Sequence, residues 1–112
     1  MCGIIGLIDY TNKLSNINNI LLNMTDSLLH RGPDFGDIYL DENFKVGLGH
    51  RRLSIQDISS AGNQPMISSD NNLIIVFNGE IYNHLKIRET LESDYKIEWA
   101  GNSDTETLLI GV

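Results

Sequence analysis

The sequence predicts one small α+β domain in which strands outnumber helices. The chain has 112 residues, the length of a single domain, and its hydrophobic fraction of 41% and charged fraction of 21% are typical of a globular protein. Short apolar runs bounded by turn residues indicate several buried strands, whereas helical spacing of apolar residues indicates only about three helices. So few helices cannot cover every face of the strands, so we expect the chain to be part of a longer polypeptide.

The first half of the chain is expected to form a strand, a helix and two more strands, in that order. Residues 2–8 (CGIIGLI) are a short apolar run with two glycines, which indicates a buried strand that another backbone or a ligand approaches closely. The next segment predicts an amphipathic helix, because its apolar residues recur at spacings of three and four: Leu14, Ile17, Leu21, Met24 and Leu28. A break at 30–34 (HRGPD) ends this helix, and residues 38–40 and 46–50 form the strands that follow.

The second half is expected to contain two strands and two helices after a loop at 57–66. Residues 73–77 (LIIVF) are the clearest buried strand of the chain. A helix follows, because four residues recur at spacings of three and four: Ile81, Leu85, Arg88 and Leu91. Residues 95–99 indicate another strand. Ser103 and Glu106 have the spacing of a capping box, so a last helix begins there.

The composition excludes several classes of function. With 8 basic and 15 acidic residues the formal net charge is −7, so the chain has no broad attraction to nucleic acid or to an anionic membrane. No apolar run approaches the roughly 18 residues of a membrane span, and the N-terminus lacks a secretory signal, so we expect a cytoplasmic protein. The single cysteine excludes an internal disulfide, and His30, His50 and His84 lack the paired spacing of a metal site.

Cys2 is the first candidate for chemistry. If Met1 is removed, this residue carries a thiol and a free α-amine on one α-carbon. A free thiol has a pKa of about 8.5 and an α-amine a pKa of about 8, so the neutral amine can accept the thiol proton without a separate histidine. The alternative is that Cys2 is only a small buried residue of the first strand.

Three other positions offer groups that bind or polarise a substrate. Asn78 and Gly79 follow a strand, where a side-chain amide and a backbone N–H can stabilise an oxyanion, although Asn-Gly is also a common turn pair. In the pair Arg51 and Arg52, a planar guanidinium can bind a carboxylate, and the alternative is a solvated surface pair. Asp104 can bind an ammonium group or can simply begin a helix. Together with the thiol, these groups would hydrolyse the side-chain amide of an α-amino acid.

Six short segments connect the chain with a known family. They occur in this order: 1–4 (MCGI), 30–34 (HRGPD), 49–55 (GHRRLSI), 63–66 (NQPM), 77–83 (FNGEIYN) and 101–106 (GNSDTE). The chain resembles the N-terminal glutaminase domain of glutamine-hydrolysing asparagine synthetases, which are class II glutamine amidotransferases. The resemblance runs over residues 2–112. It implies the αββα four-layer sandwich of the N-terminal-nucleophile hydrolases, an α+β fold with largely antiparallel sheets.

The resemblance implies a role for each matching residue. Cys2 is the nucleophile that forms a γ-glutamyl thioester, and its amine moves the proton. The side chain of Asn78 and the backbone N–H of Gly79 form the oxyanion hole, and Arg52 binds the glutamine carboxylate. The remaining substrate-binding residues that the resemblance implies are Leu53, Ile55 and Gln56, which line the pocket, and Glu80 and Asp104, which contact the amino end of glutamine.

In the family, this domain continues past the last helix and is followed by an ATP-pyrophosphatase domain. The resemblance therefore implies an incomplete glutaminase domain whose partners are L-glutamine and a C-terminal synthetase domain that uses ATP and Mg to make asparagine from aspartate. The glutaminase reaction itself needs no cofactor, and a homodimer is one assembly to test. Two alternatives stay open: a glutaminase domain that serves another acceptor, and a non-catalytic glutamine-binding module.

Overall fold

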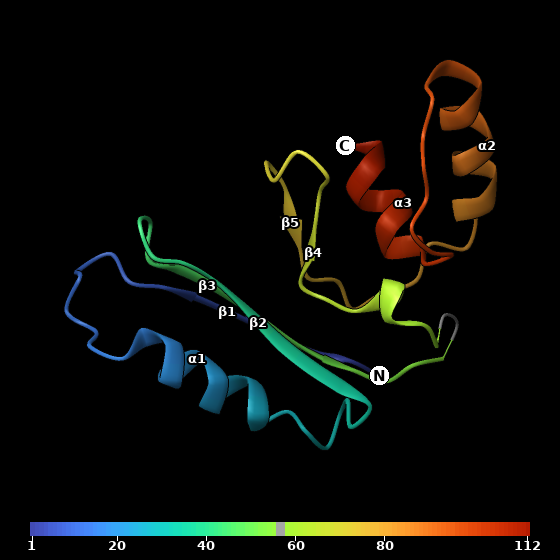
Figure 1. The fold of residues 1–112 in the computed structure, drawn as a ribbon. Helices are drawn as coiled ribbons and strands as arrows, with labels where there is room; N and C mark the ends of the chain where they lie inside the picture. Colours follow the sequence, from blue (N-terminus) through green and yellow to red (C-terminus); the bar gives the residue numbers. More distant parts are fainter. Residues whose placement is uncertain (56–57) are drawn as a thin grey trace.

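A computed structural model describes residues 1–55 and 58–112, and its elements follow the order that Figure 1 shows. The strands are β1 (Gly3–Ile8), β2 (Phe35–Asp41), β3 (Val46–Arg52), β4 (Met66–Ile67) and β5 (Ile74–Ile75). The helices are α1 (Ile17–Asp26), α2 (His84–Asp94) and α3 (Asp104–Gly111), and a short 3-10 turn covers Ser60–Gly62. None of the helices in the described ranges is long and apolar enough to cross a membrane.

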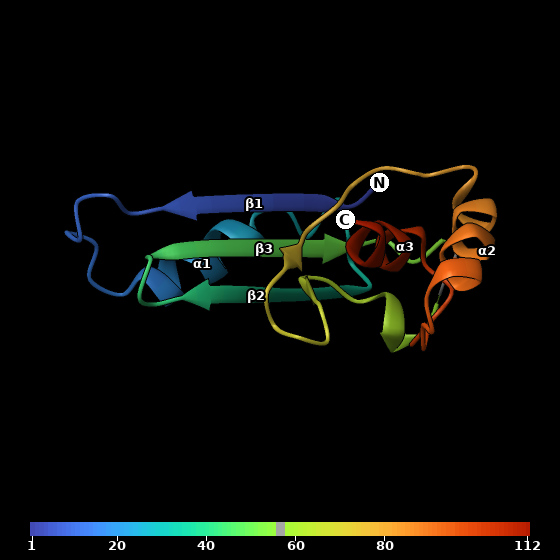
Figure 2. The same ribbon diagram turned by 90° about the horizontal axis from the view of Figure 1, so that it is seen from above.

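β3 is the central strand of a three-stranded antiparallel sheet. β1 and β2 pair with it on either side (Figure 2). In this register His50 lies between Ile4 and Asp37. Successive side chains of a strand point to opposite faces of the sheet. Arg51 therefore points toward α1, where it forms an ion pair, whereas His50 and Arg52 lie on the other face. The pleat of one strand thus separates the two neighbouring arginines.

α1 packs closely against one face of this sheet (Figure 1). Leu21 is fully buried there, and Ile17 is almost so. A β-carbon at Gly49 of β3 would lie 2.0 Å from Thr25 Oγ1, so the absence of a side chain at this position is what lets the helix approach the strand. The helix that the apolar spacing predicts is confirmed, although it begins at Ile17 rather than at Leu14.

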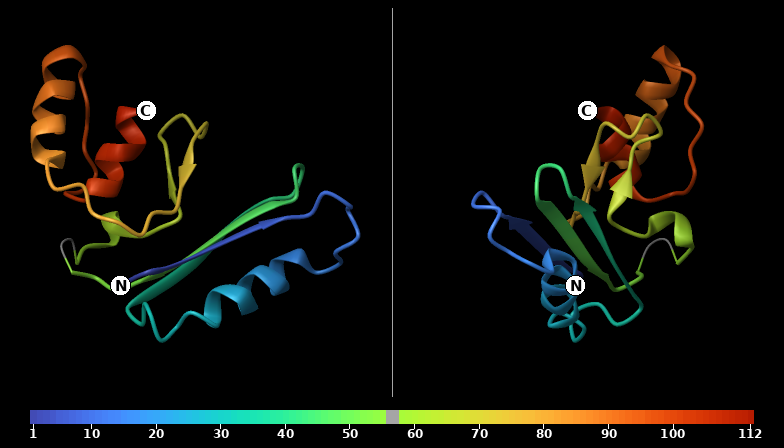
Figure 3. Two further views of the ribbon diagram at one scale, coloured as in Figure 1. Left: turned by 180° about the vertical axis from the view of Figure 1, so that it is seen from behind. Right: turned by 60° about the vertical axis from the view of Figure 1, so that its left-hand side comes forward.

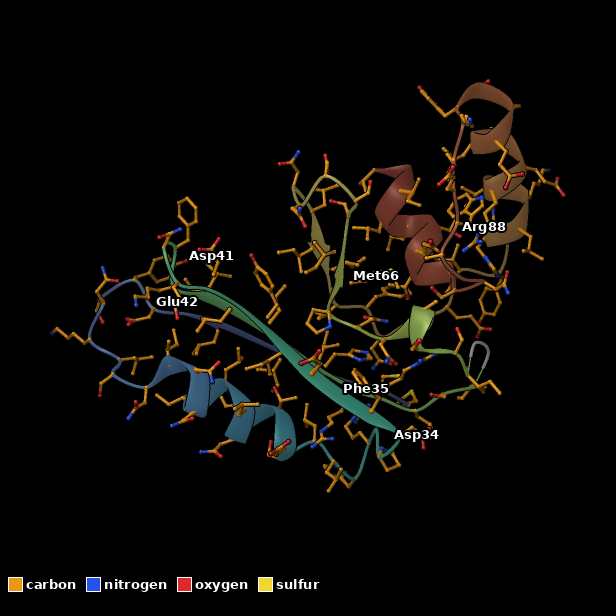
Figure 4. The ribbon with its side chains drawn as sticks, in the orientation of Figure 1. Asp34, Phe35, Asp41, Glu42, Met66 and Arg88 are labelled. Carbon is orange, nitrogen blue, oxygen red and sulfur yellow. The ribbon has the colours of Figure 1, made fainter. Side chains whose placement is uncertain are left out.

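The rest of the chain lies on the opposite side of the sheet from α1 and consists of the β4–β5 hairpin, α2 and α3 (Figure 3). Arg88 is the buried residue of α2, and it joins this helix to α3 (Figure 4). It donates hydrogen bonds of 2.8 Å to the carbonyl oxygens of Gly101 and Ser103 and forms an ion pair of 3.3 Å with Glu106. Its guanidinium also lies 4.0 Å from the centre of the Trp99 ring, a cation–π contact.

Few apolar side chains are fully buried, and the molecule is extended. Within the described ranges, the buried hydrophobic residues are Ile17, Leu21 and Leu109, whereas strand residues such as Ile4 and Ile8 are about half exposed. The radius of gyration is 15.1 Å, compared with about 13 Å for a compact domain of this length. The α+β class and the antiparallel sheets are confirmed. The four-layer αββα arrangement stays a prediction.

Two expected strands differ in the structure. Of residues 73–77, only Ile74–Ile75 form a strand. They are half-buried because, within the described residues, β5 pairs only with the two-residue strand β4. The strand expected at 95–99 is wrong. Trp99 Nε1 donates to Glu92 Oε1 of α2 at 2.6 Å, so this segment returns along the helix instead of entering a sheet.

Candidate active site

One pocket, of about 350 Å³, brings together segments from both ends of the chain. It opens between the start of β1, the end of β3, the loop after β5 and the start of α3. Eight of the nine predicted site residues line it: Cys2, Arg52, Leu53, Ile55, Asn78, Gly79, Glu80 and Asp104. The ninth, Gln56, lies outside the described residues.

Cys2 directly precedes β1 and lies beside the residues that follow β3. Its Sγ accepts a hydrogen bond of 3.3 Å from the Leu53 N–H, and the thiol can donate to the Leu53 carbonyl oxygen at 3.7 Å. Arg31 Nε donates to the Cys2 carbonyl oxygen at 3.1 Å. The loop that carries Arg31 packs directly on β3, because a β-carbon at Gly32 would lie 2.3 Å from the carbonyl carbon of Arg51. Cys2 is therefore positioned by the end of β3 and by this loop.

Arg52 is the arginine that faces the pocket. Its side chain is buried, and Nη1 donates two hydrogen bonds of 2.7 Å, one to the Ser59 carbonyl oxygen and one to Asn63 Oδ1. Arg51 lies on the other face of the sheet and pairs with Asp26 of α1, whose carboxylate is mostly exposed. Of these two arginines, Arg52 is therefore the one that lines the pocket beside Cys2.

The segment Asn78–Gly79–Glu80 forms one wall of the pocket, and both of its ends are hydrogen-bonded to other elements. Before it, the Phe77 N–H donates to Gln64 Oε1 at 2.6 Å. After it, the Ile81 N–H donates to Asp104 Oδ2 at 2.8 Å. The amide of Asn78 and the backbone of Gly79 thus lie on a short exposed loop that is held at each end.

The start of α3 fixes the position of Asp104. The Ser103 side chain caps the helix by accepting from the Glu106 N–H at 3.2 Å, as the sequence predicts. The Glu106 carboxylate does not complete the capping box; it accepts from the backbone N–H groups of Ala100 and Gly101, at 2.6 and 3.0 Å. Asp104, in the first turn, is therefore a buried carboxylate on a firmly anchored helix end.

His50 lines the same pocket and is fully buried. Within the described ranges, neither of its ring nitrogens has a hydrogen-bond partner. Burial lowers the pKa of His50 to about 4; the nearby Phe77 backbone opposes this shift without reaching hydrogen-bond geometry, and the charge of Arg52 adds to it. The ring is therefore neutral at physiological pH and adds no positive charge beside Cys2.

The pocket combines the groups that amide hydrolysis of a zwitterionic substrate requires. A thiol can act as a nucleophile, and an amide and a backbone N–H can stabilise an oxyanion. A guanidinium can bind a carboxylate, and a carboxylate can bind an ammonium group. Among the described residues, no group of three or more His, Cys, Asp and Glu side chains could hold a metal ion.

Among the residues to which the sequence assigned no role, three hydrogen-bond to parts of the site. Asn63 and Gln64 hydrogen-bond to pocket segments, and Arg31 holds the Cys2 carbonyl. Each belongs to one of the segments that carry the family resemblance, which is the signal that could have drawn attention to them. Their partners lie far away along the chain, so neither spacing nor periodicity indicates the contacts.

Comparisons with known proteins place relatives along the whole length of the chain. The model of a family described as a glutamine amidotransferase domain matches residues 1–112. Asparagine synthetase [glutamine-hydrolyzing] 1 of Bacillus subtilis (strain 168) is 39% identical over 111 residues, which cover 97% of this chain and 17% of that protein. A putative asparagine synthetase [glutamine-hydrolyzing] 2 of Methanocaldococcus jannaschii is 38% identical over 125 residues, covering 97% and 23%.

A relative with a different name shares the same region. Amidase chyE of Penicillium rubens is 37% identical over 120 residues, which cover 97% of this chain and 17% of that protein. The chain thus spans about a fifth of the length of the curated relatives that it matches.

Proposed function

The chain belongs to the glutamine amidotransferase domain family, and we propose that it hydrolyses the side-chain amide of L-glutamine through a thioester on Cys2. The observation that carries this proposal is the pocket itself. It gathers Cys2, Arg52, Asn78 and Asp104 from four separate segments around a volume of about 350 Å³. The released ammonia supplies amide synthesis by the rest of the protein.

The reaction begins at the α-amine of Cys2, once Met1 has been removed. This amine takes the thiol proton, and the thiolate attacks the side-chain carbonyl carbon of glutamine. The C–N bond breaks as the amine returns the proton to the leaving nitrogen, which departs as ammonia. Water then adds to the thioester, the same amine accepts and returns a proton, and the C–S bond breaks to give glutamate and the free thiol.

The oxyanion of each tetrahedral intermediate is stabilised by the Asn78 side-chain amide and the Gly79 N–H. These donors act where charge develops, and such donors commonly contribute a factor of about 100 or more to the rate. Two anchored ends support this role for the loop, because donors that are held in place need no reorganisation during the reaction.

The amino-acid end of the substrate determines how it lies in the pocket. Arg52 binds the α-carboxylate, and Asp104 with Glu80 binds the α-ammonium group. Leu53 and Ile55 line the pocket and contact the bound substrate. Gln56 belongs to the same proposed set of substrate-binding residues. A substrate without the carboxylate or without the ammonium group would lose one of these charged contacts, which makes glutamine the preferred amide.

The complete protein makes asparagine from aspartate in this proposal. The names of the Bacillus and Methanocaldococcus relatives support that acceptor, and the ammonia passes to a C-terminal synthetase domain that uses ATP and Mg. The four-layer αββα sandwich, a cytoplasmic location and assembly as a homodimer are parts of the same proposal. A different amide acceptor is the second candidate, because the similarity to amidase chyE covers the same residues.

The proposal is tested by measuring glutamate release from glutamine with the protein as its gene encodes it, after mass spectrometry has verified that Met1 is absent. Cys2→Ala is the matched control, since it removes only the thiol. We expect release by the unsubstituted protein and none by the variant. Equal rates for the two proteins, or a protein that binds glutamine without turnover, would favour the non-catalytic binding module.

A further inference from the structure

We propose that Asn63 and Gln64 are positioning residues, each of which holds one end of the glutamine pocket. This inference rests on the proposed function above. Asn63 orients the carboxylate ligand Arg52, and Gln64 orients the loop that carries the oxyanion donors and ties it to the start of α3. The two side chains follow one another along the chain but serve different parts of the substrate.

Asn63 fixes the rotation of the Arg52 guanidinium. Asn63 Oδ1 and the Ser59 carbonyl oxygen both accept from Arg52 Nη1, each at 2.7 Å. Two acceptors on one nitrogen define the plane of the guanidinium, and the plane decides whether it can bind a carboxylate with two parallel hydrogen bonds. Gly62 leaves space for this arrangement, because a β-carbon there would lie 2.3 Å from Arg52 Nη2.

Gln64 is a buried amide that joins two walls of the pocket. Its Oε1 accepts from the Phe77 N–H at 2.6 Å, and its Nε2 donates to Thr105 Oγ1 at 3.2 Å. Phe77 directly precedes the oxyanion donor Asn78, and Thr105 directly follows the ammonium ligand Asp104. One side chain therefore sets the distance between the loop that stabilises the oxyanion and the helix that binds the amino end.

The backbone explains why neighbouring residues can serve separate parts of the site. Asn63 has extended dihedral angles, with φ of −69° and ψ of 146°. In an extended segment, successive side chains point to opposite sides of the chain. Asn63 thus turns toward Arg52 and the 3-10 turn, whereas Gln64 turns toward Phe77 and α3.

The two residues are expected to have different kinetic effects on glutamine hydrolysis. Asn63→Ala should raise the KM for glutamine about tenfold and leave kcat within about twofold, because it loosens a ligand that binds substrate and transition state alike. Gln64→Met, which keeps the length of the side chain but removes both hydrogen bonds, should lower kcat about tenfold to a hundredfold with little change in KM, because misplaced donors lose mainly transition-state binding.

A loss of folded protein would also lower kcat, so a second measurement is needed for Gln64. Glutamate γ-semialdehyde forms a thiohemiacetal with the Cys2 thiol and places an oxygen in the oxyanion hole, whereas glutamate forms no such adduct. Gln64→Met should weaken inhibition by the aldehyde about tenfold and leave inhibition by glutamate within about twofold. Asn63→Ala should weaken both inhibitors by the same factor, because both carry the α-carboxylate.

Conservative variants and a distant control complete the experiment. Asn63→Asp keeps an acceptor oxygen toward Arg52, so KM should rise less than in Asn63→Ala. Gln64→Glu keeps an acceptor oxygen toward the Phe77 N–H, so kcat should fall less than in Gln64→Met. Asn19→Ala, on the exposed side of α1, should behave as the unsubstituted protein does. If Asn63→Ala or Gln64→Met does not fold, the comparison of the conservative variants with each other still separates KM from kcat.

The outcomes distinguish this inference from the function on which it rests. If the unsubstituted, processed protein releases no glutamate, the proposed function is wrong and the inference falls with it. If that protein is active but Asn63 and Gln64 variants change KM and kcat in the same way, or Gln64→Met weakens aldehyde and glutamate equally, only the inference is overturned. A divergent pair of kinetic effects with a changed inhibitor ratio supports it.

Discussion

Replacing Arg52 by alanine is expected to raise the KM for glutamine about tenfold to a hundredfold, while kcat changes little. Arg52 lines the pocket beside Cys2, and in our proposal its guanidinium binds the α-carboxylate of the substrate. That carboxylate does not change during amide hydrolysis. Removing its ligand therefore weakens the binding of substrate and transition state equally, which raises KM and leaves kcat largely unchanged.

The magnitude follows from the charged contact that is lost. A hydrogen bond to a charged group contributes about 1.5–3 kcal/mol, and 1.4 kcal/mol corresponds to a factor of ten. Arg52→Ala also leaves the Ser59 carbonyl and the Asn63 amide oxygen without the partner that each has at 2.7 Å. This second effect lowers the free energy of unfolding by about 1–3 kcal/mol, so the kinetics must be measured well below the melting temperature of the variant.

Arg51→Ala is the matched control, because it removes a neighbouring arginine from the other face of β3. The carboxylate of its partner, Asp26, is 62% exposed, and such surface ion pairs contribute about 0–1 kcal/mol. The KM should therefore stay within about threefold of the unsubstituted value. Initial rates of glutamate release over a range of glutamine concentrations give KM and kcat for both variants. Equal and small changes in the two would refute the assignment of Arg52, as would a loss of kcat alone.

Three further predictions concern the nucleophile, the buried histidine and the ion pair between the helices. Retention of Met1 should abolish glutamate release, because the amide nitrogen of Cys2 cannot then accept the thiol proton. Cys2→Ser should also abolish release, because a hydroxyl is a weaker nucleophile than a thiol. Activity in a sample that mass spectrometry shows to keep Met1 would exclude the amine as the base. The pKa of His50 is lowered from 6.5 to about 4, so between these pH values the unfolded state binds more protons than the folded state. The free energy of unfolding should therefore fall as the pH drops through this window, by roughly 3 kcal/mol in total. His50→Gln should flatten that part of the stability curve in denaturant titrations, and an unchanged slope would contradict the prediction. Arg88→Met should lower the free energy of unfolding by about 3–5 kcal/mol, because Glu106 would stay buried without its cation. Adding Glu106→Gln should recover part of this loss. If the loss in the double variant equals the sum of the losses in the two single variants, the prediction is contradicted.

The strands and helices that the sequence predicts correctly are those whose patterns are continuous along the chain. β1, β3 and α1 each have a run or a stripe of apolar residues, and each packs against another of these elements. The spacing of their apolar residues alone therefore predicts most of these elements. Their ends moved by a few residues, since capping and pairing decide the ends and apolar spacing does not.

Other elements could not be predicted because their environment comes from distant residues. The spacing that predicts α2 includes Leu85 and Arg88 on one stripe, yet Leu85 is 63% exposed and Arg88 is buried. Arg88 is buried because the carbonyls of Gly101 and Ser103 accept its hydrogen bonds, and no local pattern reveals those acceptors. Residues 95–99 do not form a strand for the same reason: Trp99 hydrogen-bonds to Glu92 of α2, so the segment runs back along this helix.

The candidate site shows the same division between local and distant information. A residue type in a suitable segment identified Cys2 and the pair Arg51 and Arg52 as candidates, but geometry decides which arginine faces the thiol. The pleat of β3 turns Arg52 toward the pocket and Arg51 toward α1. Asn63 and Gln64 carry no chemistry of their own, so only their hydrogen bonds to other segments reveal a contribution.

The way the pocket is assembled connects the small apolar core with the proposed reaction. Cys2 and Arg52 come from the sheet that packs on α1, whereas Asn78 and Asp104 come from the part that contains α2 and α3. Few apolar side chains are buried among the residues that the structure describes, and polar cross-links such as that of Gln64 join segments of the pocket. A substrate that is bound by Arg52 at one end and by Asp104 at the other would itself bridge them. Its binding free energy would then favour the arrangement in which the oxyanion donors face the thiol, which is where transition-state stabilisation requires them.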